Sequence, residues 1–131
     1  MFKATLTRVA NDPAGLTGAW LVLRSDGSER FNRQTFVFTP DNRYLMIDPV
    51  GDEQGVGCGS IGIEDGSFAA VNGILTATAI DQDTNGCAGL NDAEDEGVGM
   101  AMLAYSISSD GNMLTLAEGG EVAATLKRVS R

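Results

Sequence analysis

The chain has 131 residues, of which 43% are hydrophobic, and a formal net charge of −9 at pH 7. This length and composition predict one globular domain with a core of its own. The acidic balance argues against nucleic acid or an anionic membrane as a partner, because both attract Lys and Arg. No stretch is long and apolar enough to predict membrane insertion.

The charge is unevenly distributed. Fourteen of the eighteen acidic residues lie between Tyr44 and Leu126, a stretch with no Lys or Arg. We therefore expect a strongly negative side or end, which is either a solubilising face or a surface that attracts cations. The chain has no histidine. Because the commonest general base and transition-metal ligand is missing, we expect no catalytic residues and no enzyme activity.

Short apolar segments alternate with turn residues along the chain, and no window has helical periodicity. Asp65-Gly66 and Asn72-Gly73 are typical hairpin turns. The pattern predicts an all-β fold, an antiparallel up-and-down β-barrel of about eight strands, whose closure removes its edges. The expected strands are Leu16–Arg24, Thr35–Thr39, Arg43–Ile47, Val56–Ile63, Ser67–Val71, Ile74–Ile80, Val98–Ser108, Met113–Ala117 and Glu121–Val129.

The first expected strand contains the only tryptophan of the chain, in the pattern Gly18-x-Trp20. This pattern resembles the calycins, the lipocalin-like barrels, in which the tryptophan closes one barrel end and a basic residue of the last strand packs across it. The resemblance implies that Gly18, Trp20 and Arg128 (or Lys127) form a barrel seal. The run Phe36–Tyr44 is similar to a segment of small bacterial lipocalin-like domains.

A barrel of this size is narrow enough for its side chains to fill. The sequence leaves two alternatives open, a filled core or a small apolar pocket lined by methionines. The candidate interior residues are Leu21, Leu23, Phe36, Phe38, Leu45, Ile47, Ile61, Ile63, Ile74, Leu75, Met100, Met102, Leu114, Leu116 and Leu126.

One hexapeptide occurs twice. Residues 4–9 recur 120 positions later as residues 124–129, with five of six residues identical. This echo predicts a tandem array. Residues 1–14 would then be the end of a preceding repeat, with an orphan strand at 2–9 and a linker, and residues 15–131 a lipocalin-like β-barrel domain. The expected partners are neighbouring repeats of the same chain, or a second copy that forms a dimer through residues 2–9.

The longest break between apolar segments, Asp81–Glu96, is rich in acidic residues. Its spacing follows a calcium-binding loop, with a glycine at the sixth position, Gly86. The alternative is a turn in which Asx side chains bond their own backbone. Calcium is the only candidate cofactor, and its predicted ligands are Asp81, Asp83, Asn85, the carbonyl of Cys87, and Asp92.

Cys58 and Cys87 are the only cysteines, and they form either one disulfide or two free thiols. A disulfide implies an oxidising compartment. We therefore expect a non-catalytic module of a larger bacterial surface or secreted tandem-repeat protein, with a structural or adhesive role. Its location would be extracellular or at the cell surface, or cytoplasmic if the chain is complete. The alternative is a stand-alone lipocalin-like binder of a small apolar ligand.

Overall fold

The computed structural model describes residues 5, 15–23, 34–48, 61–84, 90 and 102–129. These residues form eight strands. Within these ranges no helix could serve as a membrane span. The strands are β1 (Gly18–Val22), β2 (Thr35–Phe38), β3 (Arg43–Asp48), β4 (Gly62–Val71), β5 (Ile74–Asp83), β6 (Met102–Ile107), β7 (Met113–Glu118) and β8 (Glu121–Arg128).

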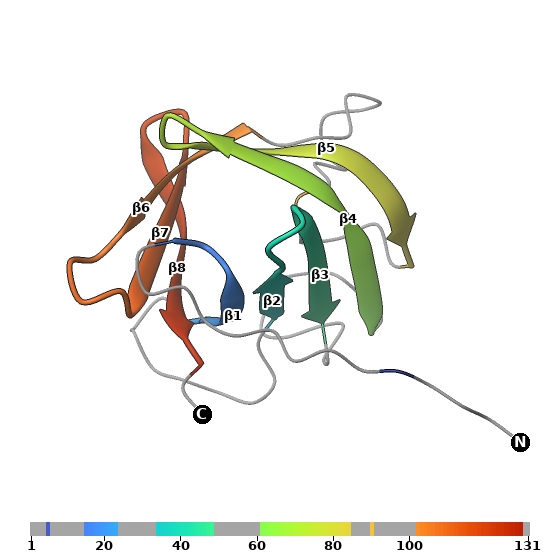
Figure 1. The fold of residues 1–131 in the computed structure, drawn as a ribbon. Coiled ribbons are helices and arrows are strands. Elements are labelled where there is room, and N and C mark those ends of the chain that lie inside the picture. The colour runs from blue at the N-terminus through green and yellow to red at the C-terminus, as the bar shows by residue number, and fades with distance from the viewer. Residues whose placement is uncertain are drawn as a thin grey trace, which may run out of the picture.

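The strands close into one barrel in sequence order (Figure 1), and every neighbouring pair is antiparallel. The barrel closes where β8 pairs with β1, with Trp20 opposite Arg128 and Val22 opposite Leu126. The predicted all-β, antiparallel, up-and-down barrel of about eight strands is therefore confirmed. Closure leaves none of the eight described strands with a free edge that could recruit another strand.

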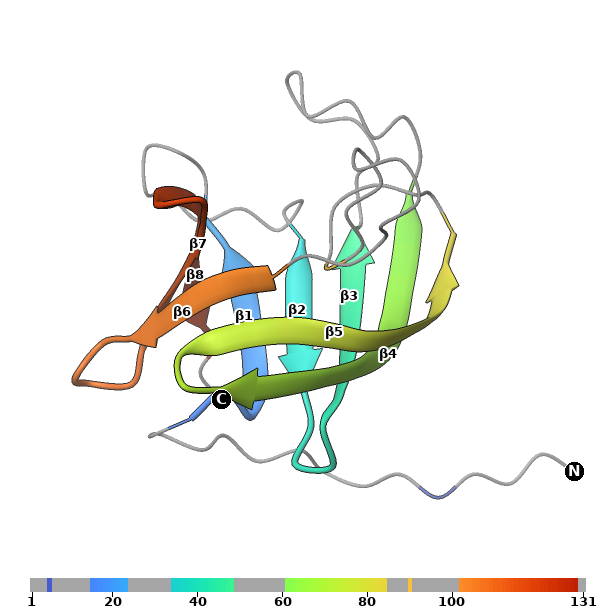
Figure 2. The same cartoon turned by 90° about the horizontal axis from the view of Figure 1, so that it is seen from above.

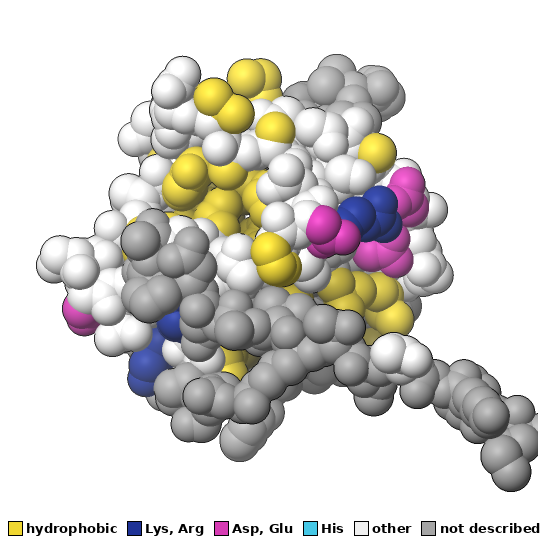
Figure 3. All heavy atoms as spheres, in the orientation of Figure 1, with side chains coloured by type: hydrophobic (Ala, Val, Ile, Leu, Met, Phe, Trp, Pro, Cys, Tyr) yellow, Lys and Arg dark blue, Asp and Glu magenta, His cyan; other side chains and the backbone are white. Residues whose placement is uncertain are grey.

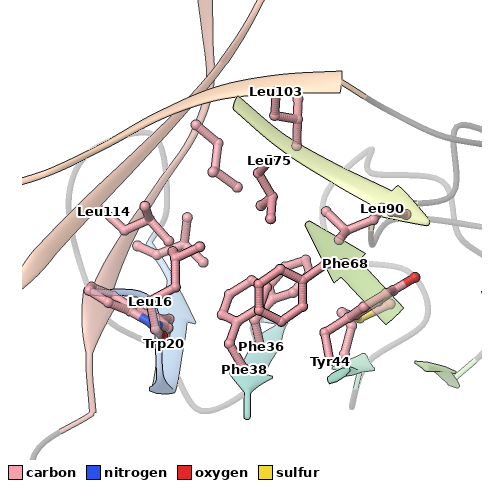
Figure 4. Packing of buried hydrophobic residues seen from close by; sticks show 14 of the residues in the cluster. Leu16, Trp20, Phe36, Phe38, Tyr44, Phe68, Leu75, Leu90, Leu103 and Leu114 are labelled. Atoms are coloured by element: carbon pink, nitrogen blue, oxygen red, sulfur yellow. The ribbon is translucent and has the colours of Figure 1, made fainter. Parts of the chain in front are cut away.

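Aromatic residues fill the middle of the barrel (Figure 4). The rings of Phe36 and Phe38 are stacked with centroids 5.8 Å apart, and Phe68 meets Phe38 edge-on at 5.1 Å. Leucines from β5, β6 and β7 face these rings from the other side. Burying such side chains contributes about 1.5–3 kcal/mol each, so this cluster dominates the stability of the fold.

The inward face of several strands differs from the predicted one. Of the candidate interior residues, Phe36, Phe38, Leu75, Leu114, Leu116 and Leu126 are buried. Leu21, Leu23 and Leu45 are only half-buried, and five others are exposed, namely Ile47, Ile61, Ile63, Ile74 and Met102. Met100 lies outside the described residues. In β1, β3 and β6 both faces carry apolar residues, so alternation alone does not say which face packs inward. In β4 the inward face carries Glu64, so the face with Ile63, and with Ile61 just before the strand, points outward.

Strand β4 runs without a break through Asp65-Gly66, where a hairpin turn was expected, and that expectation is wrong. A β-carbon on Gly66 would lie 2.0 Å from the carbonyl oxygen of Ala79. The glycine is needed here for a close approach of β5, at a bulge between the two strands. Strand β5 likewise continues to Asp83, so the acidic break begins later than expected.

The two ends of the barrel have different connections. At one end, short turns at residues 39–42, 72–73 and 108–112 join the strands, and the first of them is at the bottom of Figure 2. Asn72 and Gly73 have φ angles of 54° and 76°, the geometry of the tight hairpin turn that the sequence predicts. The connections from β1 to β2, β3 to β4 and β5 to β6 all leave from the opposite end. A ligand that entered the barrel would therefore meet different chemistry at each end.

Candidate functional sites at the two ends of the barrel

Trp20 and Arg128 meet at the end with the short turns. Trp20 is fully buried, and its Nε1 donates a hydrogen bond of 2.8 Å to the carbonyl oxygen of Leu16. The guanidinium carbon of Arg128 lies 4.1 Å from the centroid of the indole ring. Gly18 has a φ of 130°, which a residue with a side chain rarely adopts, so a glycine at this position suits the entry into β1.

Backbone carbonyls hold the other donors of Arg128. Its Nε donates to the oxygen of Gly111 at 2.7 Å, and its Nη1 and Nη2 donate to the oxygens of Thr17 and Gly15, each at 2.9 Å. The planar guanidinium can bind three carbonyls and one ring face at once, which a lysine ammonium cannot do. Lys127 is exposed on the outer face. The structure therefore brings Gly18, Trp20 and Arg128 together, and Arg128 rather than Lys127 is the basic residue.

A buried carboxylate lies in the interior towards the other end. Glu64 has no exposed surface. One of its oxygens, Oε2, accepts hydrogen bonds of 2.7 Å from the Tyr44 hydroxyl and 2.7 Å from the Leu90 amide. Glu64 lies within strand β4 and not beside a hairpin turn at Asp65-Gly66, as the sequence had suggested. The burial of Glu64 could have been recognised from its two-residue spacing with Gly66 and Phe68, which places all three residues on one face of a strand.

Two further carboxylates lie beside Glu64. Asp48 is 1% exposed and pairs with Gly62, two residues before Glu64 on the same inward face. Asp83 is directly opposite Glu64 on β5. Carboxyl groups from three adjacent strands thus lie at this end of the interior, and Asp48 and Glu64 were not among the residues expected there from the sequence.

Tyr44 bridges the aromatic core and this acidic end (Figure 4). Its pKa is raised above the ordinary value, first by burial and then by its hydrogen bond to Glu64 and the negative charges of Glu64, Asp83 and Asp65. The hydroxyl therefore stays protonated at physiological pH. It acts as a fixed hydrogen-bond donor and cannot act as a general base.

Leu90 connects the acidic segment to the core. It is 1% exposed and belongs to the same hydrophobic cluster as the phenylalanines, although acidic residues surround it in the sequence. Its amide donates to Glu64, so both its backbone and its side chain face inward. Residue 90 therefore helps to cover the acidic end of the core, a role that the sequence analysis missed.

Two predicted calcium ligands belong to strand β5. Glu64 pairs with Asp83 and Asp65 pairs with Gln82, but the next pair is Gly66 with Ile80, which leaves Asp81 as the extra residue of a bulge. A carboxylate oxygen of Asp81 lies 2.7 Å from Arg43 on the outer face. Asp83 lies on the same face as Glu64, so the bulge places Asp81 and Asp83 on different faces of the barrel wall.

The remaining predicted ligands, Asn85, Cys87 and Asp92, lie outside the described residues, as does Cys58. In the described ranges no three His, Cys, Asp or Glu side chains are close enough to hold a metal ion. Calcium binding and the disulfide therefore stay predictions.

An uncharged aliphatic row crosses the outer surface of five strands. Each residue of the row pairs with the next, in the order Val71, Ile74, Ala104, Ala117 and Val122. Val71 and Val122 are 62% and 66% exposed, and Met102 lies next to Ala104 on the same outer face, at 67%. Figure 3 shows hydrophobic side chains exposed along the upper rim of this view, above β4, β5 and β6.

No protein-family description matches the chain, and no curated protein matches it either. The functional argument therefore depends on the geometry of the barrel and on the internal echo.

Proposed function

We propose that this barrel is a non-catalytic, lipocalin-like module of a larger bacterial surface or secreted tandem-repeat protein, with a structural or adhesive role. The observation that carries the proposal is the position of the echo. Residues 124–129 comprise the last five residues of β8 and the residue after it, and this segment closes the barrel onto β1. A second copy of a closing strand has a use in an array of barrels and none in a single carrier protein.

Membership of the calycins is part of the same proposal. Its support is the closed antiparallel barrel of eight strands together with the contact of Arg128 with Trp20. The first feature is shared by several barrel classes, while the second is a specific arrangement of two side chains.

The aliphatic row supports contacts between modules. A protein with a net charge of −9 repels its own copies across most of its surface. The row Val71, Ile74, Ala104, Ala117 and Val122 has no charged member. Like-charge repulsion between neighbouring barrels is therefore weakest at its Val71, Ile74 and Ala104 end, away from the pair of Glu118 and Glu121 that adjoins Ala117 and Val122.

The sequence of the parent gene tests this proposal. We expect further copies of Ala-Thr-Leu-x-Arg-Val at a spacing near 120 residues, together with a signal for export. Antibodies against the barrel should then label intact cells. A gene that encodes one barrel only, or labelling that needs permeabilised cells, contradicts the proposal.

The second candidate function is the binding of a small apolar ligand. The observation that favours it is the covering of the acidic end by Leu90, whose amide is held by Glu64. The opposite end is closed by Trp20 and Arg128, so a ligand would enter past residue 90. Truncation by Leu90→Ala should then raise the fluorescence of an apolar dye, while the exposed substitution Met102→Ala should not. Equal dye fluorescence in both variants and the wild type would remove this candidate.

A further inference from the structure

We infer that residues 4–9 are a second closing strand, interchangeable with residues 124–129 in the slot between β7 and β1. The inference deepens the proposed tandem array and rests on it for its biological meaning. The exchange of the two strands can be tested without the sequence of the parent gene. The partner of the module would then be a strand from another copy of the same chain.

A strand between β7 and β1 needs a leucine and an arginine at fixed positions. Leu126 is fully buried in the core and pairs with Val22 on one side and Leu114 on the other. Arg128 caps Trp20 and binds three backbone carbonyls. A strand that lacked the leucine would leave a cavity, and one that lacked the arginine would leave the indole and the carbonyls uncovered.

Residues 4–9 carry the required residues at the corresponding positions. Leu6 corresponds to Leu126 and Arg8 to Arg128, and the half-buried Ala124 and Thr125 correspond to Ala4 and Thr5. The single difference, Thr7 in place of Lys127, falls on an exposed position. Identity is therefore kept at every buried and half-buried position of the hexapeptide, and of its two exposed positions Val129 is kept and Lys127 differs.

The order of segments along the chain permits the exchange. β8 runs antiparallel to β1, and the amide of Val129 donates to the carbonyl of Ala19. A strand at residues 4–9 followed by residues 10–17 would enter β1 as an antiparallel hairpin, in the same slot and direction as β8. In the present structure β8 occupies the slot, and Thr5 is exposed and belongs to no strand.

Because two strands fit the same place between β7 and β1, neighbouring copies of the chain can exchange closing strands. When residues 4–9 close the barrel that follows them, the β8 of that barrel is released. The released strand can close the next copy, as in domain swapping. Each barrel of an array would then be closed by the end of the preceding repeat, and the copies would be linked mechanically.

The test uses the full chain with β8 disabled by Leu126→Asp together with Arg128→Ala. We expect this β8-blocked chain to keep a cooperative urea transition and the native emission of Trp20, because Leu6 and Arg8 take over. Adding Leu6→Asp and Arg8→Ala to the β8-blocked chain should abolish the transition. The same two N-terminal substitutions in the wild type should shift the midpoint little, since β8 is then intact.

Thr7→Lys in the β8-blocked chain is the matched control, because it introduces at residue 7 the side chain that β8 carries at the corresponding exposed position, Lys127, and should leave the transition in place. A synthetic peptide of residues 1–14 should restore the Trp20 emission of the chain that carries all four substitutions. The inference is overturned if the β8-blocked chain is unfolded and the peptide does not restore the Trp20 emission of the chain with four substitutions. It is also overturned if the β8-blocked chain folds and substitution of Leu6 and Arg8 has no effect on its transition. Either result leaves the search for repeats in the parent gene unaffected.

Discussion

Arg128 is the residue on which the closure of the barrel depends most. Its guanidinium covers the face of Trp20 and binds the carbonyl oxygens of Gly15, Thr17 and Gly111. A partly desolvated cation–π contact contributes about 0.5–2 kcal/mol, and hydrogen bonds to a charged group contribute about 1.5–3 kcal/mol.

Because residues 4–9 are proposed to replace β8, the contribution of Arg128 is measured in a chain that carries Leu6→Asp and Arg8→Ala. In this background we expect Arg128→Ala to lower the free energy of unfolding by about 3 kcal/mol, because three carbonyls and the indole face lose their partner together. Lys127→Ala, at the neighbouring exposed position, should cost less than about 0.5 kcal/mol. Urea denaturation followed by Trp20 fluorescence measures both. Equal losses would show that the guanidinium does not seal the barrel.

Glu64 and Tyr44 form a pair whose members depend on each other. Glu64→Leu removes the acceptor of both the Tyr44 hydroxyl and the Leu90 amide. Each buried donor without a partner costs about 1–3 kcal/mol. We therefore expect a loss of about 2–5 kcal/mol in the free energy of unfolding.

The double-mutant cycle with Tyr44→Phe is the sharper measurement. In the wild type Tyr44→Phe removes a hydrogen bond, but in the Glu64→Leu background it removes an unpaired hydroxyl and should cost less or even stabilise the fold. A coupling energy of at least about 1 kcal/mol is expected. Additive effects would mean that the two groups do not interact.

Asp110 makes the stability of the β6–β7 turn depend on pH. It accepts hydrogen bonds from the Ser108 hydroxyl at 2.6 Å and the Asn112 amide at 3.0 Å. These bonds, with that of Ser108 first, hold its pKa below the ordinary value of 3.8. Because the folded pKa is the lower one, the stabilisation is complete above the unfolded pKa and is lost as the pH falls through the folded pKa.

Asp110→Asn should therefore lower the melting temperature at pH 7, and the difference from the wild type should shrink below about pH 4. Melting curves from pH 7 to strongly acidic buffers test this, with Glu121→Gln as the exposed control. A difference that stays constant with pH would contradict the role of the ionised carboxylate.

At the scale of elements, the contact between β4 and β5 shapes the barrel. The bulge beside Gly66 lets β5 approach so closely that a β-carbon would meet the Ala79 carbonyl at 2.0 Å. The same bulge directs Asp81 outward to Arg43 and leaves Asp83 opposite Glu64. One glycine therefore determines which acidic residues face the interior.

Gly66→Ala should lower the free energy of unfolding by about 2 kcal/mol, because the backbone of β5 has to move away from the new methyl group. Thr78→Ala, at an exposed position of β5, should change it by less than about 0.5 kcal/mol. Chemical denaturation of the two variants provides the comparison. A neutral Gly66→Ala would show that the two strands can separate at no cost.

At the scale of the whole molecule, the net charge of −9 opposes the compact state. We expect NaCl to raise the melting temperature because it screens this repulsion within a Debye length of about 8–10 Å.

Calcium binding at the Asp81–Asp92 pattern requires an additional rise of the melting temperature in CaCl₂ at matched ionic strength, and this excess should disappear in Asp92→Asn. Equal melting temperatures in the two salts would remove the calcium prediction.

The strand alternation predicted the barrel class, but it did not predict which face of β3 and β4 points inward. Ile47 and Met46 are both apolar, and only packing against the phenylalanines decides that Met46 is the buried one. Asp65-Gly66 has the composition of a turn, yet β5 uses this glycine for a close approach. Local composition cannot distinguish these two uses, because the difference lies in a strand that is distant in the sequence.

An all-β barrel of about eight antiparallel strands follows from the sequence alone, since period-two patterns and turn residues are local properties of the chain. The burial of Glu64 with Tyr44 and the packing of Leu90 in the core are visible only in the folded barrel. The same is true of the role of residues 124–129 as the closing strand. These facts depend on which segments meet across the barrel, and pairing between distant strands is determined by the packing of the whole molecule.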